Sequence, residues 1–175
     1  MAVATLGAGC FWCVEACYAK LLGVDKVVSG YSGGDANRTT YKEVCKGETK
    51  HAEVCQVHFN ETVISFEEIL KVFFFIHDPT SLNRQGDDIG TQYRSVIFFH
   101  DASQKEKAQD VIKKLTDAKV YSREIVTEVS PFSNFFPAED YHQDYFNQNG
   151  TEPYCQLVVK PKVEKFEKAF RESFK

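Results

Sequence analysis

The chain has 175 residues, of which 43% are hydrophobic and 26% charged, and this indicates a soluble globular protein with one core. Its net charge of −4 gives no field that would attract nucleic acid or an anionic membrane, so we expect neither as a partner. No run is long and apolar enough to span a bilayer, and the N-terminus lacks the basic and apolar regions of a signal peptide, which favours a cytoplasmic location.

Turn and breaker residues divide the first third of the chain into several elements. A strand over 2–6 is followed by a break at 7–9 and a helix over 11–22, which Gly23 closes in a left-handed conformation. A second strand begins at Val27 and runs into a turn at 32–35. The alternation over 53–59 predicts a further strand. On it, Glu53 shares a face with Cys55, Val57 and Phe59.

Helix-start signals mark the next elements. Ser65 and Glu68 have the spacing of a capping box before a strongly apolar helix that ends near Ile76, and Ser103 and Glu106 repeat that spacing before a second helix. The remaining predicted elements are a buried central strand over 95–99, a strand over 124–129, a short helix over 138–147, and a last helix opened by Pro161 whose Val163, Phe166, Phe170 and Phe174 face the core.

Strands and helices are mixed along the chain, and no linker, repeat or low-complexity tract interrupts them. We therefore expect residues 1–175 to form one catalytic domain of the α+β class, a two-layer sandwich with a small mixed sheet. The stretches 78–94 and 130–137 have little periodicity. Long irregular segments in compact domains are usually functional, so we expect these two to serve the site.

Six cysteines are many for a chain of this length in a reducing compartment, where they are free, catalytic or metal-bound more often than they form structural disulfides. Cys10 stands out because it follows Gly7-Ala8-Gly9 and precedes a predicted helix. The unpaired N–H groups and partial positive charge of a helix N-terminus stabilise a thiolate, which predicts a lowered pKa and a nucleophile. The alternative is a buried structural cysteine that caps the helix.

Phe11 and Trp12 follow Cys10 directly, and Trp12 is the only tryptophan of the chain. Flat aromatic walls beside a reactive thiol suit a small apolar group such as a methyl, although both rings could simply pack in the core.

The run Gly9-Cys10-Phe11-Trp12, with Glu15 three residues later, resembles the signature of the A-class peptide methionine sulfoxide reductases. Further runs match this family in the same order: GYSGG at 30–34, TYKEVC at 40–45, HAEV at 51–54, IHDPT at 76–80, RQGDDIGTQYRS at 84–95 and AEDYHQDY at 138–145. The match covers nearly the whole chain, and the order and spacing of the runs make it specific.

The resemblance implies a role for each matching position. Cys10 would be the nucleophile, and Phe11 and Trp12 would hold the methyl group of the substrate. The other implied positions are Glu53 as the acidic residue, Tyr41 and Tyr93 as the tyrosines that bind the sulfoxide oxygen, Asp88 beside the substrate backbone, and His142 of the AEDYHQ run in substrate binding.

The strand pattern gives Glu53 separate support. A carboxyl on an apolar face should have a raised pKa, because burial disfavours the charged form. Thiolate attack on the sulfoxide sulfur requires that the departing oxygen gain a proton, and a protonated Glu53 would supply it. Tyr41 and Tyr93 would donate hydrogen bonds to the same oxygen. The alternative is that Glu53 ends its strand facing water.

Attack would leave methionine and a sulfenic acid on Cys10, which condenses with a second thiol, and an external dithiol would then reduce the disulfide. Cys155 resembles the C-terminal resolving cysteine of many relatives, in a loop that Asn149-Gly150 could make mobile; the alternative for Cys155 is a buried strand cysteine. Cys13 is the rival, because Cys10 and Cys13 form a C-x-x-C at a helix start. We expect Cys17, Cys45 and Cys55 to be small apolar core residues.

Two departures from the family pattern affect this reading. Lys50 replaces a glycine that often precedes HAE, and the chain lacks the Gly-rich tail with a further cysteine found in some relatives. A relay through a third cysteine would then need Cys13.

The predicted function is reduction of methionine sulfoxide, free or in proteins, by a monomeric enzyme without a cofactor or metal that repairs oxidative damage. Thioredoxin or a similar dithiol as reductant, and selectivity for the S epimer, are implied by the resemblance. Two alternatives remain: a general thiol–disulfide oxidoreductase that uses Cys10 and Cys13, and a structural zinc module. The first lacks a thioredoxin-like βαβ order, and the second lacks a second pair of ligands.

Overall fold

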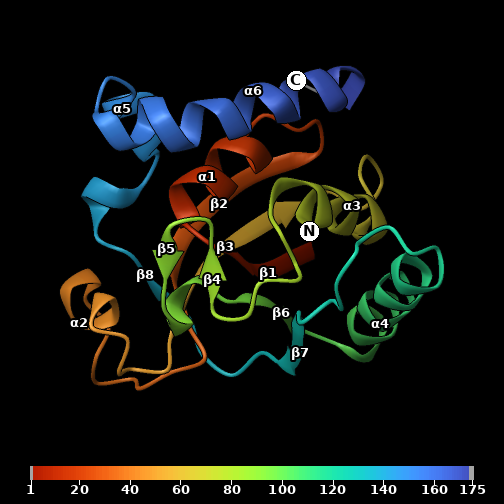
Figure 1. The fold of residues 1–175 in the computed structure, drawn as a ribbon, viewed down its shortest axis with the longest axis horizontal. Coiled ribbons are helices and arrows are strands. Elements are labelled where there is room, and N and C mark those ends of the chain that lie inside the picture. Colours follow the sequence, from red (N-terminus) through yellow and green to blue (C-terminus); the bar gives the residue numbers. More distant parts are fainter. Residues whose placement is uncertain (1, 174–175) are drawn as a thin grey trace.

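The computed structural model describes residues 2–173 (Figure 1). Six strands form one mixed sheet in the order β7-β6-β1-β3-β2-β8, in which only β6 and β7 run parallel. Their bounds are β1 Ala2–Ala8, β2 Val24–Ser32, β3 Ala52–Phe59, β6 Ser95–Phe99, β7 Glu128–Pro131 and β8 Phe136–Pro137. The predicted α+β class with a small mixed sheet is confirmed.

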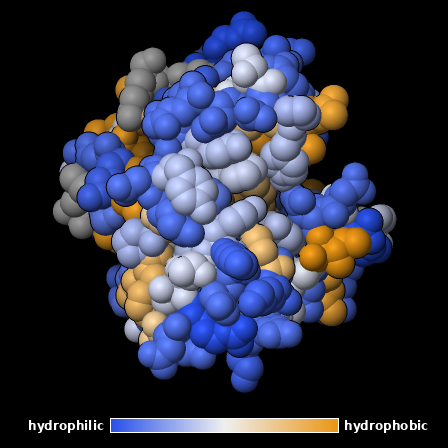
Figure 2. All heavy atoms as spheres, turned by 90° about the vertical axis from the view of Figure 1, so that its left-hand side faces the viewer, coloured by the Kyte–Doolittle hydropathy of each residue, from blue (hydrophilic) through white to orange (hydrophobic). Residues whose placement is uncertain are grey.

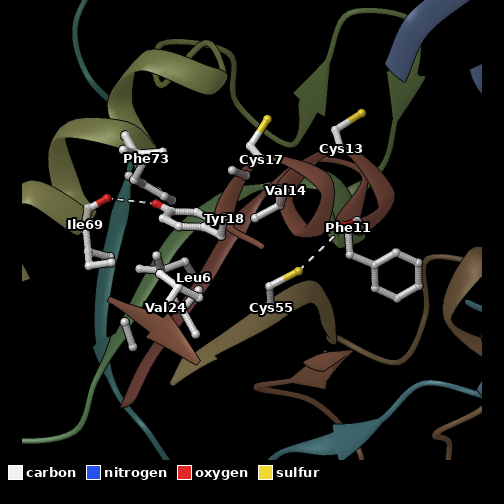
Figure 3. Close-up of a cluster of buried hydrophobic side chains, with 14 of the residues drawn as sticks. Leu6, Phe11, Cys13, Val14, Cys17, Tyr18, Val24, Cys55, Ile69 and Phe73 are labelled. Carbon is white, nitrogen blue, oxygen red and sulfur yellow. Dashed lines mark hydrogen bonds between the residues drawn. The ribbon is translucent and has the colours of Figure 1, made fainter. Parts of the chain in front are cut away.

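The helices are α1 Phe11–Tyr18, α2 Tyr41–Cys45, α3 Phe66–Ile76, α4 Ala102–Asp117, α5 Tyr145–Asn149 and α6 Lys160–Ala169. Figure 1 shows α1 and α3 over the sheet, with α6 lying across α1. Figure 3 shows the core beneath them: Leu6 and Val24 from the sheet meet Tyr18, whose hydroxyl donates to the Ile69 carbonyl at 2.8 Å. No helix within residues 2–173 has the length and apolar character needed to cross a membrane.

The opposite face of the sheet carries a smaller cluster of Ala52, Val54, Val96 and Phe98, which Phe132 and Phe135 cover. These two rings come from the irregular segment 130–137, and Asn134 of that segment hydrogen-bonds to the backbone of the Gly33-Gly34 turn. The contacts of this segment are therefore structural ones. The other irregular segment holds β4 Arg84–Gln85, β5 Asp88–Ile89 and a short 3-10 helix, Thr91–Tyr93. It lies beside Cys10, since Gln85 packs against Gly9 and Tyr93 is an electrostatic neighbour of Cys10.

Local signals predicted some helix ends and missed others. Ser65 caps α3 as expected and accepts from the Glu68 N–H at 3.1 Å. The second capping box is wrong: Asp101 caps α4 by accepting from the Gln104 N–H at 2.8 Å, two residues before the predicted cap. The first helix ends at Tyr18, so Gly23, which is left-handed at φ 90°, closes the turns beyond it and not the helix.

Three predictions in the last third are wrong in part. Of the strand predicted over 124–129, only 128–129 pairs with the sheet, as the start of β7, because the Val126 N–H donates to the Pro79 carbonyl instead. The predicted helix over 138–147 is broken at Asp144, whose φ is 54°. Cys155 lies neither in a loop nor in a strand: residues 153–169 form one continuous helical run that contains a π-helical stretch, Cys155–Val159, before α6. Val163 and Phe166 are buried as predicted, while Phe174 lies outside the described residues.

Candidate active site

Strand β1 delivers Cys10 to the start of α1. Gly9 makes the turn with φ 89°, and a Cβ there would lie 2.7 Å from the Gln85 side chain, so no larger residue fits. Gln85 is itself fixed, because its amide bonds to both the N–H and the carbonyl of Asp78. Cys10 occupies the N-cap of α1 and is 6% exposed.

Burial raises the pKa of the Cys10 thiol well above its ordinary value. A hydrogen bond with Cys13 raises it further, whereas hydrogen bonds with the Tyr154 hydroxyl and the Trp12 N–H lower it. The prediction of a lowered pKa is wrong for the free protein, because burial outweighs the helix N-terminus. Cys10 therefore rests as a thiol.

Glu53 is buried on β3, with 1% of its surface exposed. Its Oε1 accepts from the Phe11 N–H at 3.2 Å, while Oε2 is buried without a partner. Burial raises the pKa of Glu53 well above its ordinary value, and the nearby Cys10 raises it further. As predicted from the strand pattern, the carboxyl is kept protonated beside the thiol.

Tyr41 and Tyr93 reach the same place from separate elements. Tyr41 begins α2, whose cap Thr40 accepts from the Glu43 N–H, and Tyr93 ends the 3-10 helix before β6. Burial raises the pKa of both hydroxyls, and the second cause in each case is the electrostatic interaction with Glu53. Both phenols are therefore protonated donors close to the Glu53 carboxyl.

Aromatic rings surround the first turn of α1. Trp12 is half-buried and stacks on Tyr145 with the ring centres 3.8 Å apart and an interplanar angle of 8°. Phe11 is 1% exposed and packs between Tyr31 at 5.8 Å and Trp12 at 6.4 Å. The exposed aromatic surface in this turn therefore belongs to Trp12, and Phe11 lies behind it.

His142 fixes the other edge of Trp12. The indole Nε1 donates to His142 Nδ1 at 3.1 Å, so Nδ1 is the acceptor and the neutral ring carries its proton on Nε2. Burial lowers the pKa of His142, which keeps the ring neutral. Its Nε2 is buried without a partner, and the ring centre lies 4.2 Å from that of Tyr41.

Three side chains hold the segment that carries His142 and Tyr145. Glu139 accepts from the Tyr31 hydroxyl and the Tyr41 N–H, both at 3.1 Å. Gln143 bonds to the N–H and carbonyl of Ser29 on β2. Glu15 accepts from the Asp144 N–H at 2.8 Å. All three residues lie within the runs that match the family, and that position is the only sequence signal for their role.

Asp88 lies on β5, and its Oδ2 accepts from the Tyr154 hydroxyl at 2.6 Å. Tyr154 also stands edge-on to Trp12, with the ring centres 5.6 Å apart. The sequence signal for Tyr154 was its place directly before Cys155, and it was not used. Tyr154 thus joins Asp88, Trp12 and Cys10 in one cluster.

All six cysteines are free. Cys13 is buried beside Cys10, and Cys155 is fully buried on its helix, where burial and then the electrostatic interaction with Cys10 raise its pKa. Cys17 and Cys55 are core residues as predicted. Cys45 is exposed, contrary to the prediction, because it ends α2 at the surface with its thiol hydrogen-bonded to Tyr41.

Figure 2 views the molecule from the side of α2, β8 and α5. Residues of intermediate hydropathy, the class that includes Trp and Tyr, gather near the centre of this face, and hydrophilic residues surround them. Within residues 2–173, no three His, Cys, Asp or Glu side chains are grouped so that they could hold a metal ion.

The family model described as "Peptide methionine sulfoxide reductase" matches residues 2–174. The chain belongs to this family. The peptide methionine sulfoxide reductase MsrA of Saccharolobus solfataricus is 50% identical over 175 residues, which cover all of this chain and 98% of that protein. The MsrA of Acinetobacter baumannii is 48% identical and covers 100% of this chain and 99% of its own.

Solved structures of methionine sulfoxide reductases share the fold. The reduced form of Mxr1 from Saccharomyces cerevisiae superposes with a TM-score of 0.82 at 37% identity, covering 88% of each chain. Mxr1 in complex with Trx2 gives a TM-score of 0.59 at 28% identity over 82% of this chain and 84% of that one. This chain is thus a methionine sulfoxide reductase in sequence and fold, and nothing in these comparisons favours an oxidoreductase of general specificity or a zinc module.

Proposed function

We propose that Cys10 of this methionine sulfoxide reductase attacks the sulfoxide sulfur while Glu53 protonates the departing oxygen. The observation that carries the proposal is the state of Glu53: one oxygen is held by the Phe11 N–H, and the other is buried, unpartnered and close to Cys10. A raised pKa keeps the proton on the carboxyl until an acceptor arrives. The sulfoxide oxygen is such an acceptor.

Tyr41 and Tyr93 donate hydrogen bonds to the same oxygen, since both hydroxyls remain protonated near Glu53. The proton released from the Cys10 thiol replaces the one that Glu53 gives up. The S–O bond of the substrate breaks and a new S–O bond forms on Cys10. Thiol and sulfoxide thus become sulfenic acid and sulfide with no net gain of protons.

Trp12, with Phe11 behind it, holds the methyl group of the substrate, and Asp88 and His142 contact its backbone. The unpartnered Nε2–H of His142 supports this role, because a buried donor without an acceptor is costly unless a ligand supplies one. The site fixes the sulfoxide oxygen toward Glu53 and the methyl group toward Trp12. Because the sulfoxide sulfur is chiral, only one epimer, the S form, fits this arrangement. Both free and protein-bound methionine sulfoxide are substrates.

Cys155 resolves the sulfenic acid by forming a disulfide with Cys10, and thioredoxin or a similar dithiol reduces that disulfide. The complex of the related Mxr1 with Trx2 supports the choice of reductant. Cys155 is buried on a helix, and the π-helical stretch 155–159 is a weak point that would let its thiol move toward Cys10. Cys13 is the alternative resolving thiol, since it lies beside Cys10 without any rearrangement.

The chain acts as one catalytic domain and as a monomer in the cytoplasm. Six free cysteines, five of them within the buried core cluster that includes Cys10, suit a compartment that keeps thiols reduced.

Cys10→Ser tests the nucleophile. We expect it to abolish conversion of methionine sulfoxide to methionine, whereas Cys17→Ala, which alters a buried cysteine of the same helix, should retain it. Chromatography of the products on the two separated epimers reads out both activity and selectivity. Substantial turnover by the serine variant with an intact fold would remove Cys10 from the reaction.

Peptide mapping by mass spectrometry after one equivalent of substrate tests the resolving cysteine. We expect a bridge between Cys10 and Cys155, and loss of thioredoxin-supported turnover in Cys155→Ser. A Cys10–Cys13 bridge in the wild type, together with continued turnover of Cys155→Ser, would assign the role to Cys13.

A further inference from the structure

Glu15 lies one helical turn after Trp12 on α1, and only 6% of its surface is exposed. Its Oε2 accepts from the Asp144 N–H at 2.8 Å, a contact that spans 129 residues of sequence. The reaction proposed above makes no use of this carboxyl. A buried polar side chain that bonds to the backbone of a distant segment fixes where that segment lies. Glu15 therefore places the chain around Asp144 relative to α1.

The backbone that Glu15 holds has an uncommon conformation. Asp144 is left-handed, with φ 54° and ψ 34°, a region that L residues seldom adopt. Such a conformation persists where the surrounding contacts impose it. Contacts act on both sides of this bend: Gln143 bonds to Ser29 on β2, and Glu15 accepts from the Asp144 N–H. Glu15 thus acts on the residue at which the chain bends toward α1.

Tyr145 directly follows this bend and begins α5, and its ring lies on Trp12 with the ring centres 3.8 Å apart and an interplanar angle of 8°. Helix α5 has five residues, all of them described, and none is buried. A helix this short is not stable by itself, so contacts outside it determine its position. Positions three apart are neighbours on a helix, so Trp12 and Glu15 together hold the consecutive residues Asp144 and Tyr145.

We propose that Glu15 is a positioning residue, which through the Asp144 N–H keeps the Tyr145 ring flat on Trp12 and so fixes the surface that receives the methyl group of the substrate. His142 holds the indole from another side, because it accepts from Nε1 at 3.1 Å. The stack and this hydrogen bond together leave the indole one orientation. This role rests on the proposed function of Trp12 and extends it to a residue that does not touch the substrate.

Three variants separate the hydrogen bond from general stability. Glu15→Met removes the acceptor and nearly keeps the volume of the side chain, whereas Glu15→Gln keeps an oxygen that accepts from the Asp144 N–H. Burial raises the pKa of Glu15 to about 7, so at about pH 6 the carboxyl is mostly neutral and the amide is a close substitute. Tyr18→Phe is the matched control, because it also removes one hydrogen bond of a buried α1 side chain, to the Ile69 carbonyl at 2.8 Å.

Fluorescence tests the placement without any turnover, because Trp12 is the only tryptophan of the chain and its emission reports on this one ring. We expect the emission of Glu15→Met at about pH 6 to shift to longer wavelength and to be quenched more strongly by acrylamide, since the indole loses its stacked neighbour. Glu15→Gln and Tyr18→Phe should keep the wild-type spectrum. A wild-type spectrum in Glu15→Met, or a shifted one in Glu15→Gln, would overturn the proposal.

A double-mutant cycle tests whether Glu15 acts through Tyr145. Tyr145→Leu removes the stacked ring at a partly buried position, and it should shift the Trp12 emission as Glu15→Met does. In the double variant we expect no larger shift than in either single variant, because the two changes break the same contact. Additive shifts would mean that Glu15 reaches Trp12 by another route and would overturn the proposal.

The split between KM and kcat connects the placement to the substrate. Bound substrate and transition state contact Trp12 alike, so a misplaced indole raises KM with little change in kcat. For the S epimer of N-acetylmethionine sulfoxide N-methylamide, we expect KM to rise about four- to tenfold in Glu15→Met and Tyr145→Leu, the effect of about one methyl group. Glu15→Gln and Tyr18→Phe should keep the wild-type KM. An equal rise in Tyr18→Phe would indicate a general loss of structure and overturn the proposal.

Tyr145→Leu also keeps the proposal testable where Glu15→Met does not fold, because a wild-type spectrum and a wild-type KM in that variant would overturn it. The result is separate from the test of the nucleophile. Loss of turnover in Cys10→Ser supports the proposed reaction whatever the Trp12 spectrum shows. Turnover retained in Cys10→Ser would remove that reaction and leave the fluorescence comparison valid, so the two failures are distinguishable.

Discussion

At the scale of single residues, Glu53 shows how the fold sets a protonation state. Its strand faces the core, one carboxyl oxygen meets a backbone N–H, and the other meets nothing. Burial makes the pKa of Glu53 higher in the folded state than in the unfolded state. The stability that this group contributes is therefore fully present below its unfolded-state pKa, and it is lost as the pH rises toward its folded-state pKa. The site keeps a reactive proton at the expense of stability.

Glu53→Gln should slow methionine formation in a single turnover by about 10²–10⁴-fold, because the amide keeps the shape but carries no transferable proton. The melting temperature at neutral pH should be equal to or higher than that of the wild type, since no carboxyl has to stay protonated in the core. Rapid-quench assays and calorimetry measure the two quantities. An unchanged single-turnover rate would exclude Glu53 as the acid.

Glu15 gives a pH dependence with a defined window. Burial raises its pKa from 4.5 to about 7, while the Asp144 N–H lowers it. The stability it contributes is therefore complete below about 4.5 and is lost as the pH rises through about 7. Relative to the wild type, Glu15→Gln should gain about 2 kcal/mol in unfolding free energy between pH 4.5 and pH 8, after allowance for solvent screening.

Urea unfolding at the two pH values measures this difference. Glu61→Gln, a change at an exposed carboxyl outside the core, is the control and should show no such gain. A Glu15→Gln curve parallel to that of the wild type across this range would contradict the assigned cause.

At the scale of elements, the two helix starts differ in how well the sequence defines them. Ser65 is the only capping residue directly before the apolar stripe of α3, whereas α4 offers both Asp101 and Ser103. Asp101 is chosen because Gln104 then reaches back to the His100 N–H and across to the Val3 carbonyl, which ties the helix to β1. A local spacing rule does not contain that contact between distant segments.

Asp101→Ala should lower the unfolding free energy by about 1 kcal/mol, the usual effect of losing an N-cap. Ser103→Ala, inside the first turn, should change it by less than about 0.5 kcal/mol. Denaturant midpoints of the two variants provide the comparison. The reverse order would restore Ser103 as the cap.

Lys50 adopts a left-handed conformation, with φ 66°, at the position where relatives often have glycine. A side chain in this region is strained, so Lys50→Gly should raise the unfolding free energy by about 0.5–1 kcal/mol. Lys46→Gly is the matched control: this exposed lysine follows α2 as its C-cap with φ −71°, and the same substitution there should lower the unfolding free energy. Chemical denaturation of both proteins checks the opposite signs.

At the scale of the whole molecule, the sequence predicted what local patterns encode. The apolar stripe of α3, the buried strand over 95–99 and the glycine turn before Cys10 all have short-range signals and were predicted. The break at Asp144 depends on Glu15, which lies 129 residues away. The burial of Cys10 and the contacts of Glu139 depend on distant elements as well, so neither the raised pKa of Cys10, the proposed nucleophile, nor the role of Glu139 could be derived from spacing.

Leu6 tests the centre of the sheet. It is fully buried on β1, between β3 and β6, and faces α1 and α3. Leu6→Ala should lower the unfolding free energy by about 2–5 kcal/mol, whereas Leu82→Ala, at a side chain that is 70% exposed, should change it by less than about 0.5 kcal/mol. Equal denaturation midpoints for the two variants would mean that Leu6 does not lie in the core at the centre of the sheet.

The central place of β1 has a consequence for the order in which this protein acquires its structure. β1 is synthesised before the other strands of the sheet, yet its two hydrogen-bonding neighbours are β3 and β6, which begin at residues 52 and 95. On a ribosome, the strand that leads to Cys10 therefore waits for more than half of the chain before both of its edges are paired. Non-local pairing of this kind slows folding. The segment that ends in Cys10, the proposed nucleophile, thus keeps at least one unpaired edge until more than half of the chain has been made.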